Sequence, residues 1–263
     1  MELKSIVLNR DKEKSLERKH PWVFSGAINR IISDTGEAPE DGELVEVVDA
    51  RNNFLALGFF CDSTIAVRVI SFVQTAIDQD FWTKKVQSAY NVRESLGLTN
   101  NPSTNMYRLM HAEGDGVPGL IIDFYNGTAV IQAHAIGIYN SIDLIVKALQ
   151  YIYGEKLVAV YNKSAESLAK QTDTIVDNEY LYQNENPSLV GTEYNYQFNL
   201  DWIDGQKTGF FLDQRESRKL IGDFSKDKKV LNTFCYSGGF SISALKGGAS
   251  EVHSVDSSAK AIE

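Results

Sequence analysis

Short apolar runs separated by turn residues dominate the first 72 residues of the chain. Each run is rich in Val, Ile and Phe, which is typical of β-strands. The predicted strands are Leu3–Leu8, Glu43–Asp49, Phe54–Phe60 and Ile65–Phe72. Asp41–Gly42 and residues 51–53 supply turn residues between them. Several strands within so short a stretch predict a small, curled β domain of barrel type at residues 1–72.

The pattern changes at Asp78, where apolar residues begin to recur at spacings of three and four. This period predicts a helix that Asp78 or Asp80 caps and that Gly97 ends. A second amphipathic pattern covers Ile138–Tyr153, directly before Gly154, which is a favourable residue for ending a helix. Two helices are therefore expected in the middle of the chain.

Asn126–Gly127 stands between two apolar runs, Leu120–Tyr125 and Thr128–Ala133. Asn-Gly is the strongest short signal for a β-hairpin, because both residues tolerate the positive φ of a type I′ turn. A further strand is predicted at Val158–Tyr161. Residues 73–190 therefore predict a central α+β unit with two helices and an antiparallel sheet.

Strands and helices alternate in the last part of the chain. Tyr194–Leu200 alternates apolar and polar residues, which predicts a strand with one wet face. The alternation that follows predicts parallel strands joined by right-handed crossovers. Its elements are a helix at Leu212–Ile221, a buried strand at Lys229–Phe234, a helix at Phe240–Leu245, a strand at Val252–Val255 and a helix opening at Ala259.

Composition narrows the class of protein. The chain has 263 residues, 43% of them apolar and 23% charged, as in globular proteins. No apolar run approaches the ~20 residues of a membrane helix, and Met1–Arg10 lacks a signal-peptide core, so we expect no membrane association and a cytoplasmic location. Cys61 and Cys235 belong to no Cys/His cluster, which predicts neither a metal site nor a disulfide.

The charge is distributed unevenly. A net charge of −9 argues against attraction of the whole surface to nucleic acid. Residues 1–30 nevertheless hold seven basic and four acidic side chains. A basic end on an acidic body can bind phosphate with one face, although a solvated helix of mixed charge explains the same residues equally well.

The clearest chemical signal is the turn Ser237–Gly239, between the strand that ends at Phe234 and the next helix. Paired glycines let a ligand approach the backbone, and a helix N-terminus offers N–H groups to a carboxylate or phosphate. Asp256 ends the following strand, where an acid accepts hydrogen bonds from ribose hydroxyls. These features favour a ribose-bearing cofactor, unless the glycines merely turn the chain. The lack of G-x-G-x-x-G weakens a nicotinamide or flavin interpretation.

A second polar segment, Asp204–Arg218, precedes this turn. It contains Lys207, Asp213 and Arg215, which are close in sequence to the cofactor strand and could line the same pocket. A surface loop with an apolar anchor at Phe210–Phe211 is the alternative.

Four strings of residues, in this order, resemble the PUA-bearing class I methyltransferases that modify large-subunit rRNA. They are RKHPWVFSGAI at 18–28, EGDGVPGLIID at 113–123, GQKTGFFLDQR at 205–215 and VLNTFCYSGGFS at 230–241 followed by VDSS at 255–258. The resemblance spans essentially the whole chain and implies a multidomain fold of α/β and α+β type. Its parts would be an N-terminal PUA-like β-barrel (1–72), a central α+β domain (73–190) and a partial Rossmann-like methyltransferase domain (191–263).

The resemblance also implies a function, which is methyl transfer from S-adenosyl-L-methionine to RNA, with C5 of a 23S rRNA cytosine as the expected target. The residues implied to bind the cofactor are Lys207, Thr208, Phe210, Asp213, Gln214, Arg215, Asn232, Phe234, Ser237, Gly238, Gly239 and Asp256. Those implied to face RNA are Arg18, Lys19, His20 and Trp22, although Pro21–Phe24 is equally consistent with plain core.

The chain departs from the family's pattern at its C-terminus, where it stops inside a predicted helix. We therefore expect a truncated polypeptide that is inactive alone and has an unpaired apolar edge on the strand Lys229–Phe234. Cytosine C5 methylation requires an activated nucleophile, a cysteine thiolate. Cys235 on the cofactor strand and Cys61 in the β domain are not expected to serve, so the catalytic residue is unknown.

Two other functions remain open at this point. One is an RNA-binding module, or an inactive fragment that retains part of the cofactor site. The other is a nucleotide-dependent oxidoreductase, which only the order of strand, glycines, helix and acid favours. The sequence decides neither the target nucleotide nor the oligomeric state, for which a homodimer is one option.

Overall fold

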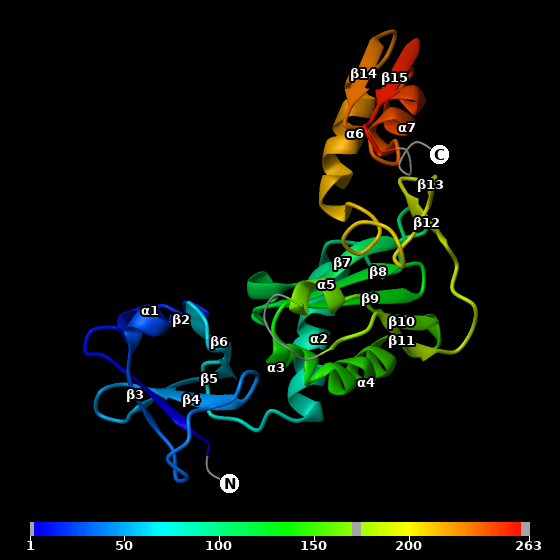
Figure 1. Cartoon of the computed structure of the whole chain (residues 1–263). Coiled ribbons are helices and arrows are strands. Elements are labelled where there is room, and N and C mark those ends of the chain that lie inside the picture. Colours follow the sequence, from blue (N-terminus) through cyan, green and yellow to red (C-terminus); the bar gives the residue numbers. More distant parts are fainter. Residues whose placement is uncertain (1–2, 170–174, 259–263) are drawn as a thin grey trace.

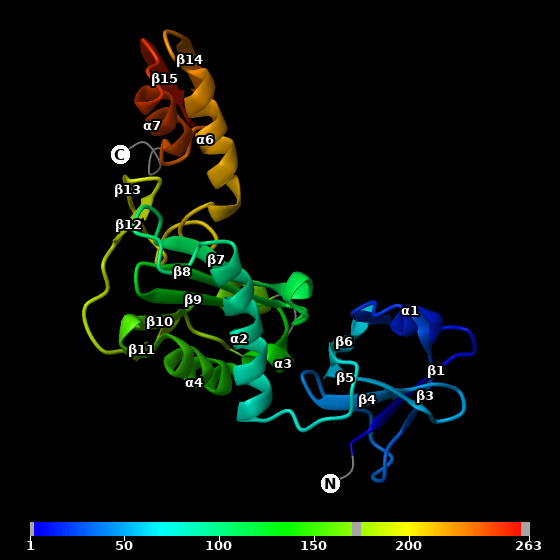
Figure 2. The same cartoon turned by 180° about the vertical axis from the view of Figure 1, so that it is seen from behind.

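The computed structural model describes residues 3–169 and 175–258. Figures 1 and 2 show three regions that follow one another along an elongated, bent molecule. The first 72 residues lie at one end, the central sheet and its helices lie in the middle, and β14 and β15 lie at the other end. Successive parts of the sequence therefore occupy successive parts of the molecule.

The N-terminal region is built on one six-stranded sheet in the order β2-β6-β5-β4-β1-β3. Its strands are β1 (Ser5–Leu8), β2 (Trp22–Phe24), β3 (Ile28–Ile32), β4 (Leu44–Val48), β5 (Phe54–Phe60) and β6 (Ile65–Ser71), with the short helix α1 (Lys14–Glu17) after β1. Only the β1–β4 pair is parallel. The four predicted strands are confirmed. The sequence missed β2, which has three residues, and β3, whose residues after Ile28 are exposed.

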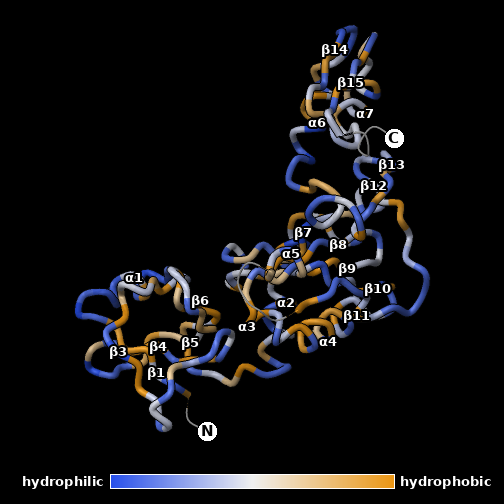
Figure 3. The backbone as a smooth tube through the Cα atoms, in the orientation of Figure 1, coloured by the Kyte–Doolittle hydropathy of each residue, from blue (hydrophilic) through white to orange (hydrophobic). Residues whose placement is uncertain are grey.

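The central region contains a five-stranded sheet in the order β11-β10-β9-β8-β7. Its strands are β7 (Met106–His111), β8 (Leu120–Tyr125), β9 (Thr128–Ala133), β10 (Ala159–Asn162) and β11 (Glu179–Gln183). The helices α2 (Gln79–Ser95) and α4 (Ile142–Tyr153) pack against each other, and the short helices are α3 (Ile136–Tyr139) and α5 (Ala165–Leu168). Apolar residues concentrate in these strands and in α4 (Figure 3).

Local signals were reliable in this region, and one long-range prediction was wrong. Asp78 caps α2 by accepting the Phe81 N–H, and Asn126 and Gly127 both have positive φ in the turn between β8 and β9. The sheet is mixed instead of antiparallel, because β10 pairs with β9 in parallel. A parallel pair needs a crossover connection, and α3 and α4 provide it between these two strands.

The last region begins with a hairpin of β12 (Val190–Glu193) and β13 (Tyr196–Asn199). The strand predicted across Tyr194 is wrong there, because Tyr194 and Asn195 have positive φ and turn the chain. After the hairpin come α6 (Arg215–Phe224), β14 (Lys229–Thr233), α7 (Gly239–Lys246) and β15 (Glu251–Val255). The predicted alternation is thus confirmed as far as β15.

The strands β14 and β15 are parallel, as expected. The prediction that the first of them is buried is wrong, since the side chain of Leu231 is 66% exposed. Within residues 3–169 and 175–258, β14 pairs only with β15, so one of its edges is unpaired. The helix predicted from Ala259 falls outside the described residues.

The N-terminal sheet meets the central region where α3 packs on β5. Gly137 in α3 is buried there, and a Cβ atom at this position would lie 2.3 Å from Cγ of Phe59. Only a residue without a side chain lets the helix approach the strand this closely. Gly137 therefore fixes the distance between the two regions.

We expect Gly137→Ala to lower the free energy of unfolding by roughly 1–3 kcal/mol, because the added methyl group overpacks this contact. Denaturant unfolding followed by circular dichroism measures the change. Gly26→Ala is the matched control, since a Cβ there meets nothing within 4 Å. An unfolding midpoint of Gly137→Ala equal to that of wild type would contradict the prediction.

Candidate cofactor and RNA site

The segment between β14 and α7 is a sharp bend with unusual backbone angles. Phe234 (φ 59°), Tyr236 (φ 47°) and Gly238 (φ 77°) all lie in the left-handed region. Residues other than glycine adopt this region at a cost in energy, and such positions cluster at ligand sites. Gly238 forms the N-cap of α7, so the bend leads directly into the first turn of that helix.

Asp256 lies at the end of β15, beside this bend. Its carboxylate accepts the N–H of Ser258 at 2.9 Å and the N–H of Tyr236 at 2.8 Å. These backbone donors hold the pKa of Asp256 below its usual value, because they favour the charged form. Asp256 therefore presents a negative charge next to the bend and also ties the bend to β15.

A cavity of about 520 Å³ opens at the bend. Its walls come from the loop before α6, from α6, from β14 and the bend, and from the tip of β15. Of the residues predicted to bind a cofactor, the cavity is lined by Phe210, Gln214, Asn232, Phe234, Ser237, Gly239 and Asp256. The structure thus brings together residues that are 46 positions apart in the sequence.

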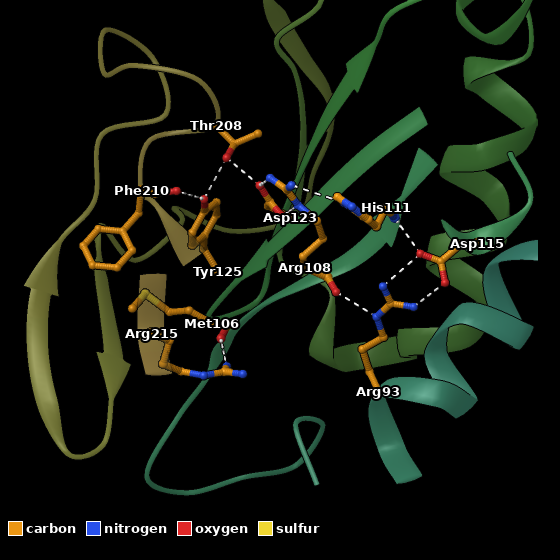
Figure 4. Close-up of polar contacts among 10 residues, drawn as sticks. All are labelled: Arg93, Met106, Arg108, His111, Asp115, Asp123, Tyr125, Thr208, Phe210 and Arg215. Carbon is orange, nitrogen blue, oxygen red and sulfur yellow. Dashed lines mark hydrogen bonds and ion pairs between the residues drawn. The ribbon is translucent and has the colours of Figure 1, made fainter. Parts of the chain in front are cut away.

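The other predicted cofactor residues do not line this cavity. Gly238 lies within the bend, whereas Lys207 and Asp213 are exposed on the neighbouring loop. Thr208 is buried, and its hydroxyl contacts the central sheet (Figure 4). Arg215 reaches the carbonyl of Met106 at 3.5 Å and forms an ion pair with Glu216, so its guanidinium also faces the central region.

Arg218 lines the cavity although the sequence did not single it out. It forms a buried, bidentate ion pair with Glu193 of β12, in which both N–O distances are 2.7 Å. Its guanidinium also lies 4.6 Å from the ring centroid of Phe210 and donates to the carbonyl of Phe211. Glu193 is 25 residues away in sequence, so no local pattern could have indicated this pairing.

His134 follows β9, is half-buried, and feels the charge of three cations that the sequence did not group together, which we call the basic cluster. Burial lowers the pKa of His134, and so do the positive charges of Lys207, Arg108 and Arg68, while Glu113 acts in the opposite direction. The three cations come from the loop before α6, from β7 and from β6. The cations that act on His134 thus come from all three regions of the molecule.

The residues predicted to face RNA lie on the surface of the N-terminal region. Arg18, Lys19 and His20 are exposed, and the rings of His20, Trp22 and Phe24 form a cluster with centroid distances of 5.8–6.2 Å. Trp22 is half-buried, and its indole N–H donates to Glu113 at 2.9 Å. The alternative, that Pro21–Phe24 belongs to the core, holds for Val23, which is buried between Trp22 and Phe24 in the sequence.

Within residues 3–169 and 175–258, no group of three or more His, Cys, Asp or Glu residues could hold a metal ion. Cys61 and Cys235 are both buried and unpaired with each other.

The family comparisons match two parts of the chain. Residues 6–72 match the PUA-like domain family, and residues 170–262 match the S-adenosylmethionine-dependent methyltransferase family. The cavity lies within the second range. The chain therefore carries matches to a PUA-like family and to a methyltransferase family, and the resemblance predicted from the motifs is confirmed.

Individual relatives agree with this combination. Proteins named ribosomal RNA large subunit methyltransferase I from Photobacterium profundum and Tolumonas auensis are 41% and 39% identical over 98% of this chain. The chain spans 64% of the length of each.

Two solved structures have the same fold. One is a protein from Streptococcus mutans described as a SAM-dependent methyltransferase, with a TM-score of 0.80, and the other is a methyltransferase complexed with SAH, with a TM-score of 0.81. Both are 25% identical and cover 98% of this chain, which matches 64% and 63% of their lengths.

The basic surroundings of His134 predict a dependence of stability on pH. A histidine of the unfolded chain binds a proton near pH 6.5, whereas the folded pKa of His134 is lower. Below about pH 6.5 the unfolded state therefore binds this proton more readily than the folded state. The contribution of neutral His134 to stability is present in full above this pH and is lost as the pH falls through the folded pKa. We expect His134→Gln to lose less stability than wild type between about pH 7.5 and 5. Urea unfolding at each pH measures this, and parallel pH profiles would contradict it.

Proposed function

We propose that this chain binds S-adenosyl-L-methionine in the cavity at the bend and contributes to a methyltransferase that acts on RNA, with large-subunit rRNA as the substrate. The observation that carries the proposal is the cavity itself. It combines a bend of left-handed backbone, the start of a helix and a carboxylate at the tip of the next strand. These are the elements that bind ribose-bearing cofactors in doubly wound folds, and they lie in the range that matches the methyltransferase family.

Each wall of the cavity suits one part of this cofactor. Asp256 would accept hydrogen bonds from the ribose hydroxyls, and the N–H groups at the start of α7 would face a carboxylate. The rings of Phe210 and Phe211 supply apolar surface for the adenine or the methionine chain. When bound, the cofactor supplies an electrophilic methyl group on its sulfonium. The chain's own contribution is to hold that group in a fixed place and to exclude water.

Two surfaces support the proposed binding of RNA, one on the N-terminal region and one at the basic cluster around His134. Cations bind phosphates regardless of sequence, and exposed aromatic rings stack on unpaired bases. Arg18 and Lys19 are exposed, Lys19 lies 4.7 Å from the ring centroid of Phe72, and the exposed ring of Phe24 contacts His20 and Trp22. Lys207 and Arg68 belong to the basic cluster around His134. We propose that RNA runs from the N-terminal region over this cluster toward the cavity.

We propose three parts, at residues 1–72, 73–190 and 191–263, whose limits lie close to those of the separate sheets. We also propose that the methylated base is a cytosine and the methylated atom is C5, in line with the sequence motifs. The proposed location of the protein is the cytoplasm. No described helix is long and apolar enough to cross a membrane. Cys235 lies in the bend and forms part of the wall of the cofactor cavity, and Cys61 follows β5 in the N-terminal region, so neither is proposed as the catalytic nucleophile.

Isothermal titration with S-adenosylhomocysteine tests the cofactor assignment. We expect saturable binding by the wild-type chain, and Asp256→Ala should weaken it by roughly tenfold, because the ribose hydroxyls would lose their acceptor. Asp223→Ala, which removes an exposed carboxylate from α6, is the matched control. Equal affinity of Asp256→Ala and wild type would refute the role of Asp256. Binding of NAD in place of S-adenosylhomocysteine would favour an oxidoreductase.

The salt dependence of binding to in-vitro-transcribed large-subunit rRNA tests the RNA surface. Affinity falls as salt rises, and removing one cation that binds a phosphate should make the slope of log affinity against log salt shallower by about one. We expect the double variant Arg18→Ala/Lys19→Ala to make the slope shallower, whereas Lys84→Ala, on the exposed face of α2, should leave it unchanged. An unchanged slope in the double variant would remove these two residues from the RNA surface.

A further inference from the structure

The loop between β13 and α6 is attached to the central sheet through a buried group of polar side chains (Figure 4). The hydroxyl of Thr208 donates to Asp123 Oδ2 at 2.6 Å and lies 2.9 Å from the hydroxyl of Tyr125. Asp123 and Tyr125 both belong to β8, where they are separated by one residue and point to the same side of the strand. All three side chains are buried.

The direction of these hydrogen bonds follows from their number. Asp123 also accepts from Arg108, at 2.9 Å from Nε and 3.0 Å from Nη2. Because the only hydroxyl proton of Thr208 goes to Asp123, Tyr125 must donate its own proton either to Thr208 or to the carbonyl of Phe210, which lies 3.3 Å away. Thr208 thus donates to Asp123 of the central sheet, and Tyr125 donates back to the loop, at Thr208 or at Phe210.

This arrangement fixes the loop at one point. A buried carboxylate or hydroxyl that loses its hydrogen-bond partner becomes costly, so Thr208 cannot leave without penalising both Asp123 and Tyr125. The loop is also held at its other side, where Lys163 donates to the carbonyls of Gly205 and Ile203 at 2.5 and 3.3 Å. Together these contacts hold the loop at residues 203, 205 and 208.

The fixed point lies directly beside the cavity. Gln206 and Phe210, two residues to either side of Thr208, both line the cavity, whereas Thr208 does not. Phe210 in turn packs against the guanidinium of Arg218, which lines the cavity from α6. The position of Thr208 therefore decides where one wall of the cavity lies.

We propose that Thr208, Asp123 and Tyr125 are positioning residues for the cofactor site, in which Thr208 acts through the loop and does not contact the cofactor. This assignment differs from the role in framing the cofactor that the sequence motif implied for Thr208. We call the contacts among Thr208, Asp123 and Tyr125 the clamp. Its role rests on the proposed function, since the clamp affects cofactor binding only if the cavity is the cofactor site. By this proposal the central region is part of the methyltransferase site, because it holds one of its walls.

Three variants test the clamp. Thr208→Val keeps the shape of the side chain and removes the hydroxyl, whereas Thr208→Ser keeps the hydroxyl. Tyr107→Phe is the matched control, because it removes the hydroxyl that contacts Tyr153 at 2.8 Å in the central core and leaves the loop untouched. Titration with S-adenosylhomocysteine should show affinity roughly tenfold weaker for Thr208→Val, while Thr208→Ser and Tyr107→Phe should stay within about twofold of wild type.

Hydrogen exchange in the absence of ligand provides the second measurement. Thr208→Val should speed exchange of the amides between residues 205 and 212, and Tyr107→Phe should not. Wild-type affinity in Thr208→Val, reduced affinity in Thr208→Ser, or unchanged exchange in the loop would overturn the clamp. A wild-type chain that bound no S-adenosylhomocysteine would instead refute the proposed function, and the exchange rates would still decide whether Thr208 fixes the loop. If Thr208→Val does not fold, Tyr125→Phe takes its place with the same expected direction in both measurements.

Discussion

Asp123 is fully buried in β8, and a carboxylate removed from water must have hydrogen-bond donors to be tolerated. Arg108, on the neighbouring strand, provides two donors, and Thr208 provides a third from a loop 85 residues further along the chain. The requirement for this third donor draws the loop onto the central sheet. Because Gln206 and Phe210 flank Thr208 and line the cavity, the layout of the candidate cofactor site depends on the buried charge.

A second buried ion pair fixes α6, the helix into which this loop leads. The buried pair of Arg218 and Glu193 joins α6 to the hairpin of β12 and β13, and Arg218 also holds Phe210 and Phe211. A desolvated ion pair of this kind is weak evidence for stability, but its bidentate geometry specifies one orientation of the helix. The cavity thus has defined walls from contacts that lie outside the strand–bend–helix segment.

Several local features could be predicted from the sequence because the residues that determine them are adjacent. Asn126–Gly127 predicted the turn between β8 and β9, Asp78 predicted the start of α2, and the alternation after residue 211 predicted α6, β14, α7 and β15. The motif at residues 230–241 likewise indicated the bend, and Asp256, predicted at the tip of the next strand, lines the same cavity. Turn geometry, caps and periodicity depend on a few neighbouring residues, so they can be read without knowledge of the fold.

Which distant side chains meet became apparent only in the folded molecule. There β10 is parallel to β9, Leu231 is exposed on β14, and the hydroxyl of Thr208 contacts the central sheet instead of lining the cavity. Arg68, Arg108 and Lys207 also gather around His134. The local elements and the motif that marks the cofactor segment follow from the order of residues alone. The burial of each polar group and the choice of its partner depend on contacts between residues far apart in the chain, and no spacing or composition records them.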